Sequence, residues 1–247
     1  LTYDGLRMRV GATSDDELDR IIREGGRRGE IYSGLRALRD TYGGLVRARF
    51  PQIPRRVSGY NLDFLLPENG FHVARALVGT EGTCVTILEA TARLVPSPPA
   101  RALLLLGFED VYRAADAVPF VTRYGPIGLE GIDALLGEHT RKKKLNAKGL
   151  ALLPPGGGWL YAEFGGETVA EAESRAEALM EGFGSRPDAP AMRLFRDPIE
   201  SQQAWSVRES ALGATSFVPG EGHNWEGWED AAVPPGRLGD YLRDLRK

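Results

Sequence analysis

The first fifty residues carry two stretches in which apolar positions recur every three or four residues, the period of an α-helix. In the first stretch, Ser14 and Glu17 have the spacing of a capping box, and the paired glycines at 25 and 26 are expected to end the helix. A second helix is expected over residues 30–49. Its expected buried side consists of Ile31, Leu35, Leu38, Tyr42, Leu45 and Val46.

Two other stretches alternate between apolar and polar positions with the period of two that is typical of a β-strand. These stretches are residues 7–12 and 85–95, and the residues 51–70 between the second helix and the second strand are rich in loop formers. Prolines at 96, 98 and 99 end the second strand and predict a stiff linker. We therefore expect a domain boundary there, with one domain over residues 1–98 and another over residues 99–247.

Beyond the linker, strand-like and helix-like segments alternate. Strands are expected over residues 101–107, 127–132, 159–164 and 192–195, and helices over residues 110–124, 168–183 and 198–212. The first of these helices contains Pro119, which is expected to interrupt it. In the second helix, Ala172, Ala176, Leu179 and Met180 are expected to face inward. This order predicts an α+β sandwich in which helices cover one face of an antiparallel sheet. The basic run over residues 141–144 is interpreted as a solvated helix end.

The two ends of the sequence suggest a piece of a longer protein. The chain starts at Leu1 instead of a methionine, and it stops within the amphipathic pattern of Leu238, Tyr241, Leu242 and Leu245. That pattern predicts a helix with one apolar side. We therefore expect the chain to be a fragment that is inactive by itself.

Composition narrows the class of protein. The chain of 247 residues has 42% apolar and 26% charged residues, and its net charge of −3 argues against nucleic acid as a partner. No apolar run approaches the roughly 20 residues of a transmembrane helix. The single cysteine, Cys84, excludes an internal disulfide and a thiolate metal cage and is expected to be a small buried residue. A reduced cytoplasmic setting fits, with peripheral membrane contact left open.

Two segments have residues that suit a phosphate-bearing or planar ligand. The segment Gly79–Thr80–Glu81–Gly82–Thr83 has glycines that permit positive φ, so that backbone N–H groups can converge on an anion. The alternative is a tight turn without a ligand. The segment 55–62 supplies cations, an aromatic ring and an amide, and its alternative interpretation is a solvated loop.

Together the two segments resemble a known family. Ser58–Gly59–Tyr60–Asn61–Leu62, followed by the segment 77–86 and a stretch that ends in Arg-Leu-Val-Pro, is similar to FAD-linked oxidases of the vanillyl-alcohol-oxidase fold, which have a PCMH-type FAD-binding domain. The most similar group comprises D-lactate, glycolate and D-2-hydroxyglutarate dehydrogenases, in bacterial forms that are fused to an iron–sulfur region. The resemblance continues through the segments 205–209 and 225–230 and covers nearly the whole chain.

The resemblance implies the distal half of an FAD-binding domain followed by a ferredoxin-like α+β substrate domain with an antiparallel sheet. It implies FAD as cofactor, a small D-2-hydroxy acid as substrate, hydride transfer to the flavin, and an electron acceptor or iron–sulfur cluster outside this chain. The implied FAD contacts are Gly59, Tyr60, Asn61, Gly79, Thr80, Glu81, Gly82, Thr83 and Val85. Cys84 and Val85 replace the Leu-Gly that is usual in the family. The family's pyrophosphate loop would precede Leu1, and its histidine-containing motif would follow Lys247.

The resemblance also points to a substrate contact. Arg208 lies in a Trp-x-x-Arg-Glu segment, and in similar enzymes this arginine binds the substrate carboxylate. The alternative is a surface ion pair with an acid on the helix. Trp228 stands where D-2-hydroxyglutarate enzymes often have a lysine, and Trp225 and Trp228 would either wall a pocket or pack in the core. The three histidines, His72, His139 and His223, lack metal-site spacing and are expected at the surface or as caps.

Two hypotheses from different classes follow. The first is an FAD-dependent 2-hydroxy-acid dehydrogenase, in which the protein orients the substrate and the flavin carries the redox chemistry. The second is a non-catalytic α+β module for assembly or partner binding, with glycines that serve only the turns. Whether the purified full-length protein is yellow distinguishes the two.

Overall fold

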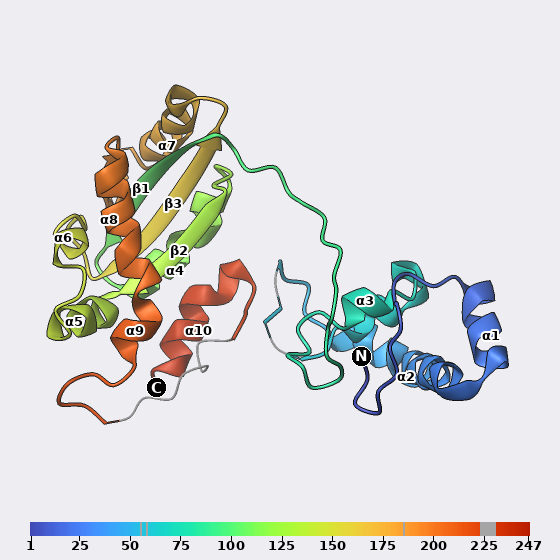
Figure 1. Ribbon diagram of the computed structural model, residues 1–247. Coiled ribbons are helices and arrows are strands. Elements are labelled where there is room, and N and C mark those ends of the chain that lie inside the picture. Colours follow the sequence, from blue (N-terminus) through green and yellow to red (C-terminus); the bar gives the residue numbers. More distant parts are fainter. Residues whose placement is uncertain (55, 58, 185, 223–230) are drawn as a thin grey trace. The chain divides into compact units, whose positions relative to one another are not determined.

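The computed structural model describes residues 1–54, 56–57, 59–184, 186–222 and 231–247 (Figure 1). The chain divides into two compact units, which we call unit 1 and unit 2. Unit 1 consists mainly of Leu1–Leu94, and unit 2 consists mainly of the chain from Val95 onwards. The assignment of residues 1–98 and 99–247 to an FAD-binding and a substrate domain stays a prediction. Each helix among the described residues is too short or too polar to cross a bilayer.

Unit 1 begins with two helices whose start and end follow the local sequence. The hydroxyl of Ser14 accepts a hydrogen bond from the amide of Glu17, so α1 (Asp15–Glu24) has the predicted cap. Gly25 follows with a φ of 70° and ends α1, and α2 (Gly26–Arg49) starts directly after it. The second helix therefore starts four residues before the expected position.

The core of unit 1 lies between these helices and three short ones, η1 (Leu62–Leu65), η2 (Pro67–Asn69) and α3 (Val73–Ala76). Glycines let the backbones approach: a Cβ on Gly29 would lie 3.0 Å from the carbonyl oxygen of Ile21, and one on Gly43 would lie 3.2 Å from the side chain of Leu66. The buried apolar cluster comprises Leu18, Ile21, Tyr32, Leu65, Phe71 and Val73.

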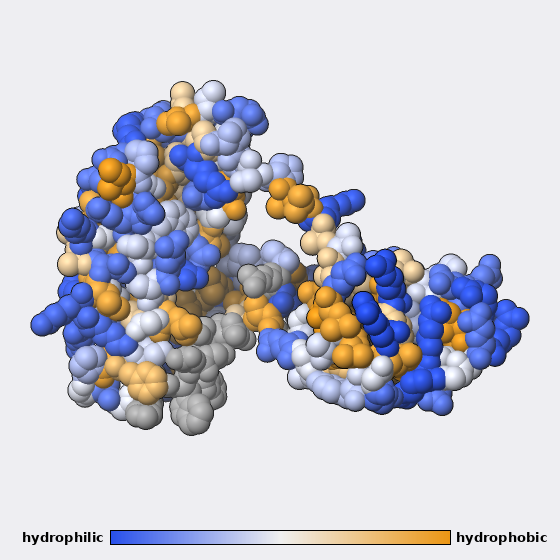
Figure 2. All heavy atoms as spheres, viewed as in Figure 1, coloured by the Kyte–Doolittle hydropathy of each residue, from blue (hydrophilic) through white to orange (hydrophobic). Residues whose placement is uncertain are grey.

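The prediction of which side of α2 is buried is partly wrong. Val46 is buried as expected, but Leu38, Tyr42 and Leu45 are exposed, and Tyr32 is buried in their place. The reason is that, among the described residues, α1 and η1 are the main elements that pack against α2, so a narrow side of the helix is covered. Figure 2 accordingly shows apolar side chains on the surface of unit 1 as well as polar ones.

The two strands expected in unit 1 are also wrong. Residues 7–12 and 85–95 are extended segments without a hydrogen-bond ladder among the described residues. Isolated backbone hydrogen bonds join them to the rest of the unit: the amide of Val73 donates to the carbonyl of Gly11, and the amide of Thr86 donates to the carbonyl of Leu1. Alternation predicts which side a strand would bury, but a strand forms only where a neighbouring strand pairs with it.

Unit 2 is built around a four-stranded antiparallel sheet with the order β2-β3-β1-β4. The strands are β1 (Ala100–Phe108), β2 (Gly128–Asp133), β3 (Gly158–Gly166) and β4 (Ala191–Phe195). The helices α4 (Val111–Thr122) and α7 (Val169–Phe183) follow β1 and β3, which gives the β-α-β-β-α-β order of a ferredoxin-like fold. The expected α+β fold with an antiparallel sheet is confirmed.

Helices cover both faces of this sheet, which corrects the expectation of one covered face. Along β1, Leu104 and Leu106 face α4 and α7, whereas Leu103 and Leu105 face the opposite layer. That opposite layer is formed by α5 (Ala134–Lys142), α6 (Ala147–Leu150), α8 (Pro198–Glu209) and α9 (Ala211–Thr215). The unbroken leucine run in β1 fits a strand that is buried on both faces.

Three further expectations in unit 2 can be settled. Pro119 lies inside α4 without interrupting it, because the buried side of that helix, which includes Val118 and Val121, is held against the sheet. The basic run is not simply solvated: Lys142 pairs with Glu221, and Lys143 donates to the carbonyl of Gly213 at 2.6 Å. The expected C-terminal helix is present as α10 (Leu238–Leu245), after η3 (Pro235–Arg237).

Candidate functional site

The two glycine-containing segments of unit 1 lie side by side, although about twenty residues separate them in the sequence. The hydroxyls of Tyr60 and Thr83 are 2.9 Å apart. The side-chain amide of Asn61 donates to the carbonyl oxygen of Val78 at 2.8 Å. Ser58 and Arg55, which belong to the first segment, lie outside the described residues. The structure therefore brings Tyr60 and Asn61 directly against the loop 78–83, which we call the glycine loop.

Internal hydrogen bonds hold the glycine loop in shape. The buried hydroxyl of Thr80 donates to the carbonyl of Leu77 at 2.9 Å, and the amide of Thr83 donates to the carbonyl of Thr80 at 2.9 Å. Tyr3 adds a hydrogen bond from its hydroxyl to the carbonyl of Gly82. A loop that is tied down in this way can present its backbone to a ligand in a fixed arrangement.

The glycine loop fits a cofactor that approaches the peptide backbone. Gly79, Glu81 and Gly82 have φ values of 79°, 48° and 74°, in the left-handed region that favours glycine. Gly59, in the neighbouring segment, has a φ of 82°. No described atom lies within 4 Å of an ideal Cβ on Gly59 or Gly82, so both residues border open space. Val85 is half-buried at the end of the loop.

Cys84 does not have the buried position that its size suggested. Its side chain is exposed, and its sulfur lies 3.8 Å from the Thr83 hydroxyl. The reason is that residues 85–95 form no strand, so no neighbouring strand covers the end of the loop.

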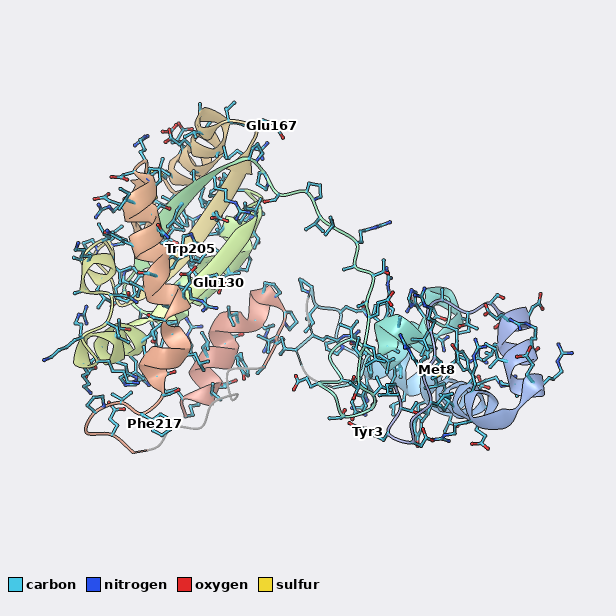
Figure 3. The ribbon with its side chains drawn as sticks, viewed as in Figure 1. Tyr3, Met8, Glu130, Glu167, Trp205 and Phe217 are labelled. Carbon is cyan, nitrogen blue, oxygen red and sulfur yellow. The ribbon has the colours of Figure 1, made fainter. Side chains whose placement is uncertain are left out.

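In unit 2, Arg208 lies on α8 and reaches across to the sheet. Its Nε and Nη2 atoms are both 2.8 Å from the Oε2 atom of Glu130 on β2. Figure 3 labels Glu130 on β2 and Trp205 one turn before Arg208 on α8. Arg208 is thus in a partly exposed ion pair, as the alternative interpretation expected, but the acid is on a strand 78 residues away in the sequence and not on the helix.

Aromatic rings lie beside this ion pair. The ring of Trp205 packs against the ring of Tyr161 on β3, with 5.4 Å between the ring centroids. Tyr161 is fully buried, and its hydroxyl has no hydrogen-bond partner among the described residues. Burial raises the pKa of the Tyr161 hydroxyl, while the positive charge of Arg208 acts in the opposite direction. The hydroxyl is therefore protonated at neutral pH and able to donate.

Glu130 and Tyr161 were not singled out from the sequence. Tyr161 looks like one more aromatic residue of a buried strand, and Glu130 looks like a solvated acid in a strand of glycines and aliphatic residues. A charged residue in an otherwise apolar strand is the one signal that could have identified Glu130. Their common neighbour, Arg208, comes from a helix far along the chain, so the cluster depends on tertiary structure.

The histidines have different positions. His72 caps α3 by accepting from the amide of Arg75, as expected for a capping residue. His139 on α5 is buried, with its Nε2 atom 3.3 Å from Glu221, so it is neither a surface residue nor a cap. His223, Trp225 and Trp228 lie outside the described residues. Within the described part of the chain, no three metal-ligating side chains come together.

Comparison with curated proteins gives relatives at modest identity. The chain is 28% identical over 255 residues to a D-2-hydroxyglutarate dehydrogenase of Pseudomonas putida, covering 98% of this chain and 25% of the relative. It is 26% identical to a mitochondrial D-lactate dehydrogenase [cytochrome] of Arabidopsis thaliana, covering 72% of this chain and 30% of the relative. It is 27% identical to the glycolate oxidase subunit GlcD of Bacillus subtilis, covering 71% of this chain and 36% of the relative.

The chain thus spans about a quarter to a third of the length of these relatives. The profile of a protein family described as "FAD linked oxidases, C-terminal domain" matches residues 97–247, which include the whole sheet of unit 2 and Arg208. The resemblance inferred from the motifs is confirmed at this level, and the chain belongs to the FAD-linked oxidase family.

Proposed function

We propose that this chain is part of an FAD-dependent oxidoreductase that oxidises a D-2-hydroxy acid by hydride transfer to the flavin. In this proposal, residues 1–98 are the distal half of a PCMH-type FAD-binding domain, and residues 99–247 are the substrate domain. The observation that carries the proposal is that Arg208, in the domain matched by the family profile, already holds a carboxylate, that of Glu130.

The residues of unit 1 would hold the cofactor. Gly79, Glu81 and Gly82 would present backbone groups from a loop fixed by its own hydrogen bonds, with Thr80 and Thr83 as its internal ties. Gly59, Tyr60, Asn61 and Val85 would border the same surface. FAD, when bound, supplies the acceptor for the hydride.

Arg208 would fix the substrate. A guanidinium can bind a carboxylate through two parallel hydrogen bonds, which sets both the position and the orientation of the group. In a 2-hydroxy acid the carboxylate is attached to the reacting carbon. Clamping the carboxylate therefore also fixes the C–H bond, and such positioning can lower a barrier by several kcal/mol.

The names of the relatives limit the candidate substrates to the 2-hydroxyglutarate, lactate and glycolate types. Trp228, in place of the lysine expected for a 2-hydroxyglutarate enzyme, leaves the choice among them to experiment. Electrons would pass to an acceptor outside this chain, such as an iron–sulfur region or a quinone.

The test is anaerobic titration of the flavin-loaded full-length protein with D-2-hydroxyglutarate, D-lactate and glycolate. We expect one of them to bleach the flavin absorbance and its L-enantiomer, where one exists, to leave it unchanged. A full-length protein that takes up no FAD, or a flavin that none of the three acids reduces, would contradict the proposal and favour a non-catalytic module.

A further inference from the structure

Glu130 and Tyr161 are direct cross-strand partners on the same face of the sheet. Glu130 on β2 is paired with Tyr161 on β3, and Tyr161 is paired in turn with Leu105 on β1. Leu105 and Tyr161 belong to the apolar cluster that α8 covers, so this row of side chains faces Arg208. Side chains that are paired across antiparallel strands are close enough to interact.

The ion pair of Glu130 and Arg208 is of a kind that a ligand can break. The Nε and Nη2 atoms of Arg208 approach the same oxygen of Glu130, Oε2. The pair therefore lacks the two parallel hydrogen bonds of the strongest arginine–carboxylate arrangement. The side chains are 38% and 42% exposed, and ion pairs this open to water contribute little stability. A carboxylate that engages the guanidinium through both oxygens would compete well.

The buried Tyr161 hydroxyl has no hydrogen-bond partner among the residues that the structure describes. Leaving a buried hydroxyl without a hydrogen bond costs free energy, so such a group calls for a specific explanation. The packing of Trp205 against the ring fixes its orientation, so the hydroxyl cannot easily turn towards solvent. The nearest acidic side chain on its row is Glu130, which is turned towards Arg208.

We propose that Glu130 is a specificity-determining residue that occupies Arg208 until a substrate carboxylate replaces it, and that Tyr161 then donates a hydrogen bond to the displaced carboxylate of Glu130. This inference rests on the proposed function, in which Arg208 binds the substrate. Arg208 thus exchanges one carboxylate for another, and the carboxylate of Glu130 exchanges Arg208 for the Tyr161 hydroxyl. A hydroxy compound without a carboxylate cannot displace Glu130 and therefore finds Arg208 closed.

The test is a double-mutant cycle on binding. The dissociation constants of D-lactate and D-2-hydroxyglutarate are measured by calorimetry for the flavin-loaded full-length protein as wild type, Glu130→Gln, Tyr161→Phe and the double variant. Glu200→Gln is the matched control, because Glu200 pairs with Arg193 at 3.0 Å with side chains 43% and 37% exposed. Thermal unfolding of each variant shows whether it is folded.

We expect Glu130→Gln to tighten binding of the better ligand about fivefold, or about 1 kcal/mol. Tyr161→Phe should weaken binding about threefold in the wild-type background and leave it unchanged in the Glu130→Gln background. Lactamide, which lacks the carboxylate, should bind only where Glu130 is replaced.

Unchanged or weaker binding in Glu130→Gln would overturn the inference. An equal effect of Tyr161→Phe in both backgrounds would overturn the role of Tyr161. Should Tyr161→Phe fail to fold, the Glu130→Gln and lactamide results still decide.

Arg208→Ala distinguishes a failure of the proposed carboxylate exchange from a failure of the proposed function. Binding that is lost in Arg208→Ala but unaffected by Glu130→Gln would refute the exchange and leave the proposed function in place. Carboxylate binding that does not depend on Arg208 in any variant would refute both.

Discussion

The glycine loop of unit 1 and the Arg208 cluster of unit 2 present chemistry to a ligand in different ways. The glycine loop offers backbone groups, and its shape comes from positive φ angles and hydrogen bonds within a few residues. The Arg208 cluster offers side chains from one helix and two strands, and its shape comes from the sheet. A loop of the first kind can be found from local sequence, whereas a cluster of the second kind exists only after the chain has folded.

The two regions should therefore fail differently when they are mutated. If the proposed cofactor site is right, a side chain added to the glycine loop should expel the cofactor, because the backbone would be the binding surface. A side chain removed from the Arg208 cluster should leave the cofactor bound and impair the use of substrate.

Arg208→Ala should have the largest effect. We expect kcat/KM of the flavin-loaded full-length protein for its best 2-hydroxy acid to fall by about 100-fold or more, on the order of 2.7 kcal/mol, with unchanged flavin content. Arg208→Lys keeps the charge but loses the two-pronged geometry, so a fall of at least ~10-fold is expected. Steady-state kinetics measure both.

Arg193→Ala is the control for Arg208, because Arg193 is similarly exposed and similarly paired with an acid in the same unit. It should leave kcat/KM near the wild-type value. Near-normal turnover in Arg208→Ala would mean that Arg208 is a structural partner of Glu130 and that the carboxylate binds elsewhere.

Gly82→Val should cause loss of flavin with a modest fall in stability. The residue has a φ of 74° and borders open space, so valine would be strained and would fill the side that the cofactor approaches. The measurement is the ratio of flavin to protein absorbance after purification. Gly70→Val is the matched control, since Gly70 has a φ of 75° and equally open surroundings but lies outside the loop.

If both glycine variants lose flavin equally, the loss reflects backbone strain in unit 1. If Gly82→Val keeps its full flavin content, residues 79–83 form an ordinary turn, and the cofactor assignment there is wrong.

Tyr60→Phe should have a smaller effect, because it removes one hydrogen bond between the two segments of the site. The hydroxyl lies 2.9 Å from that of Thr83, and a hydrogen bond of this kind contributes about 1 kcal/mol. We expect flavin affinity to fall by about fivefold, measured by fluorescence quenching. Tyr42→Phe, at a similarly exposed tyrosine on α2, should leave affinity unchanged; an equal fall in both would contradict the pairing.

The smallest effect concerns pH and unit 1 alone. Two hydrogen bonds from Arg47 lower the pKa of Glu68 from 4.5 to about 2. Because the folded pKa is below the unfolded one, this pair stabilises the fold above pH 4.5, and the stabilisation is lost as the pH falls towards 2. Both side chains are open to solvent, so the gain is small.

Thermal unfolding should therefore show a slightly steeper loss of stability on acidification in the wild type than in Glu68→Gln. Identical pH dependence in the two proteins would show that the pair contributes nothing measurable in solution.

Several local features of this protein could be predicted from the sequence. The Ser14 cap, the end of α1 at Gly25 and the strands of unit 2 follow from residues within a few positions of one another, because capping and periodicity act over one or two turns. The motifs also identified the family, since Gly79, Gly82 and their neighbours form one continuous segment.

Features that depend on a distant partner could not be predicted from local sequence. Residues 85–95 alternate like a strand but have no strand beside them, and Pro119 stays inside a helix that the sheet holds in place. The exposed side of α2 and the second covered face of the sheet likewise depend on which elements pack together. Above all, the sequence does not show that Arg208 pairs with Glu130 beside Tyr161, whose hydroxyl has no hydrogen-bond partner in the described part of the chain. The strand register and the position of α8 bring these three side chains together, and both are set by packing across the whole unit.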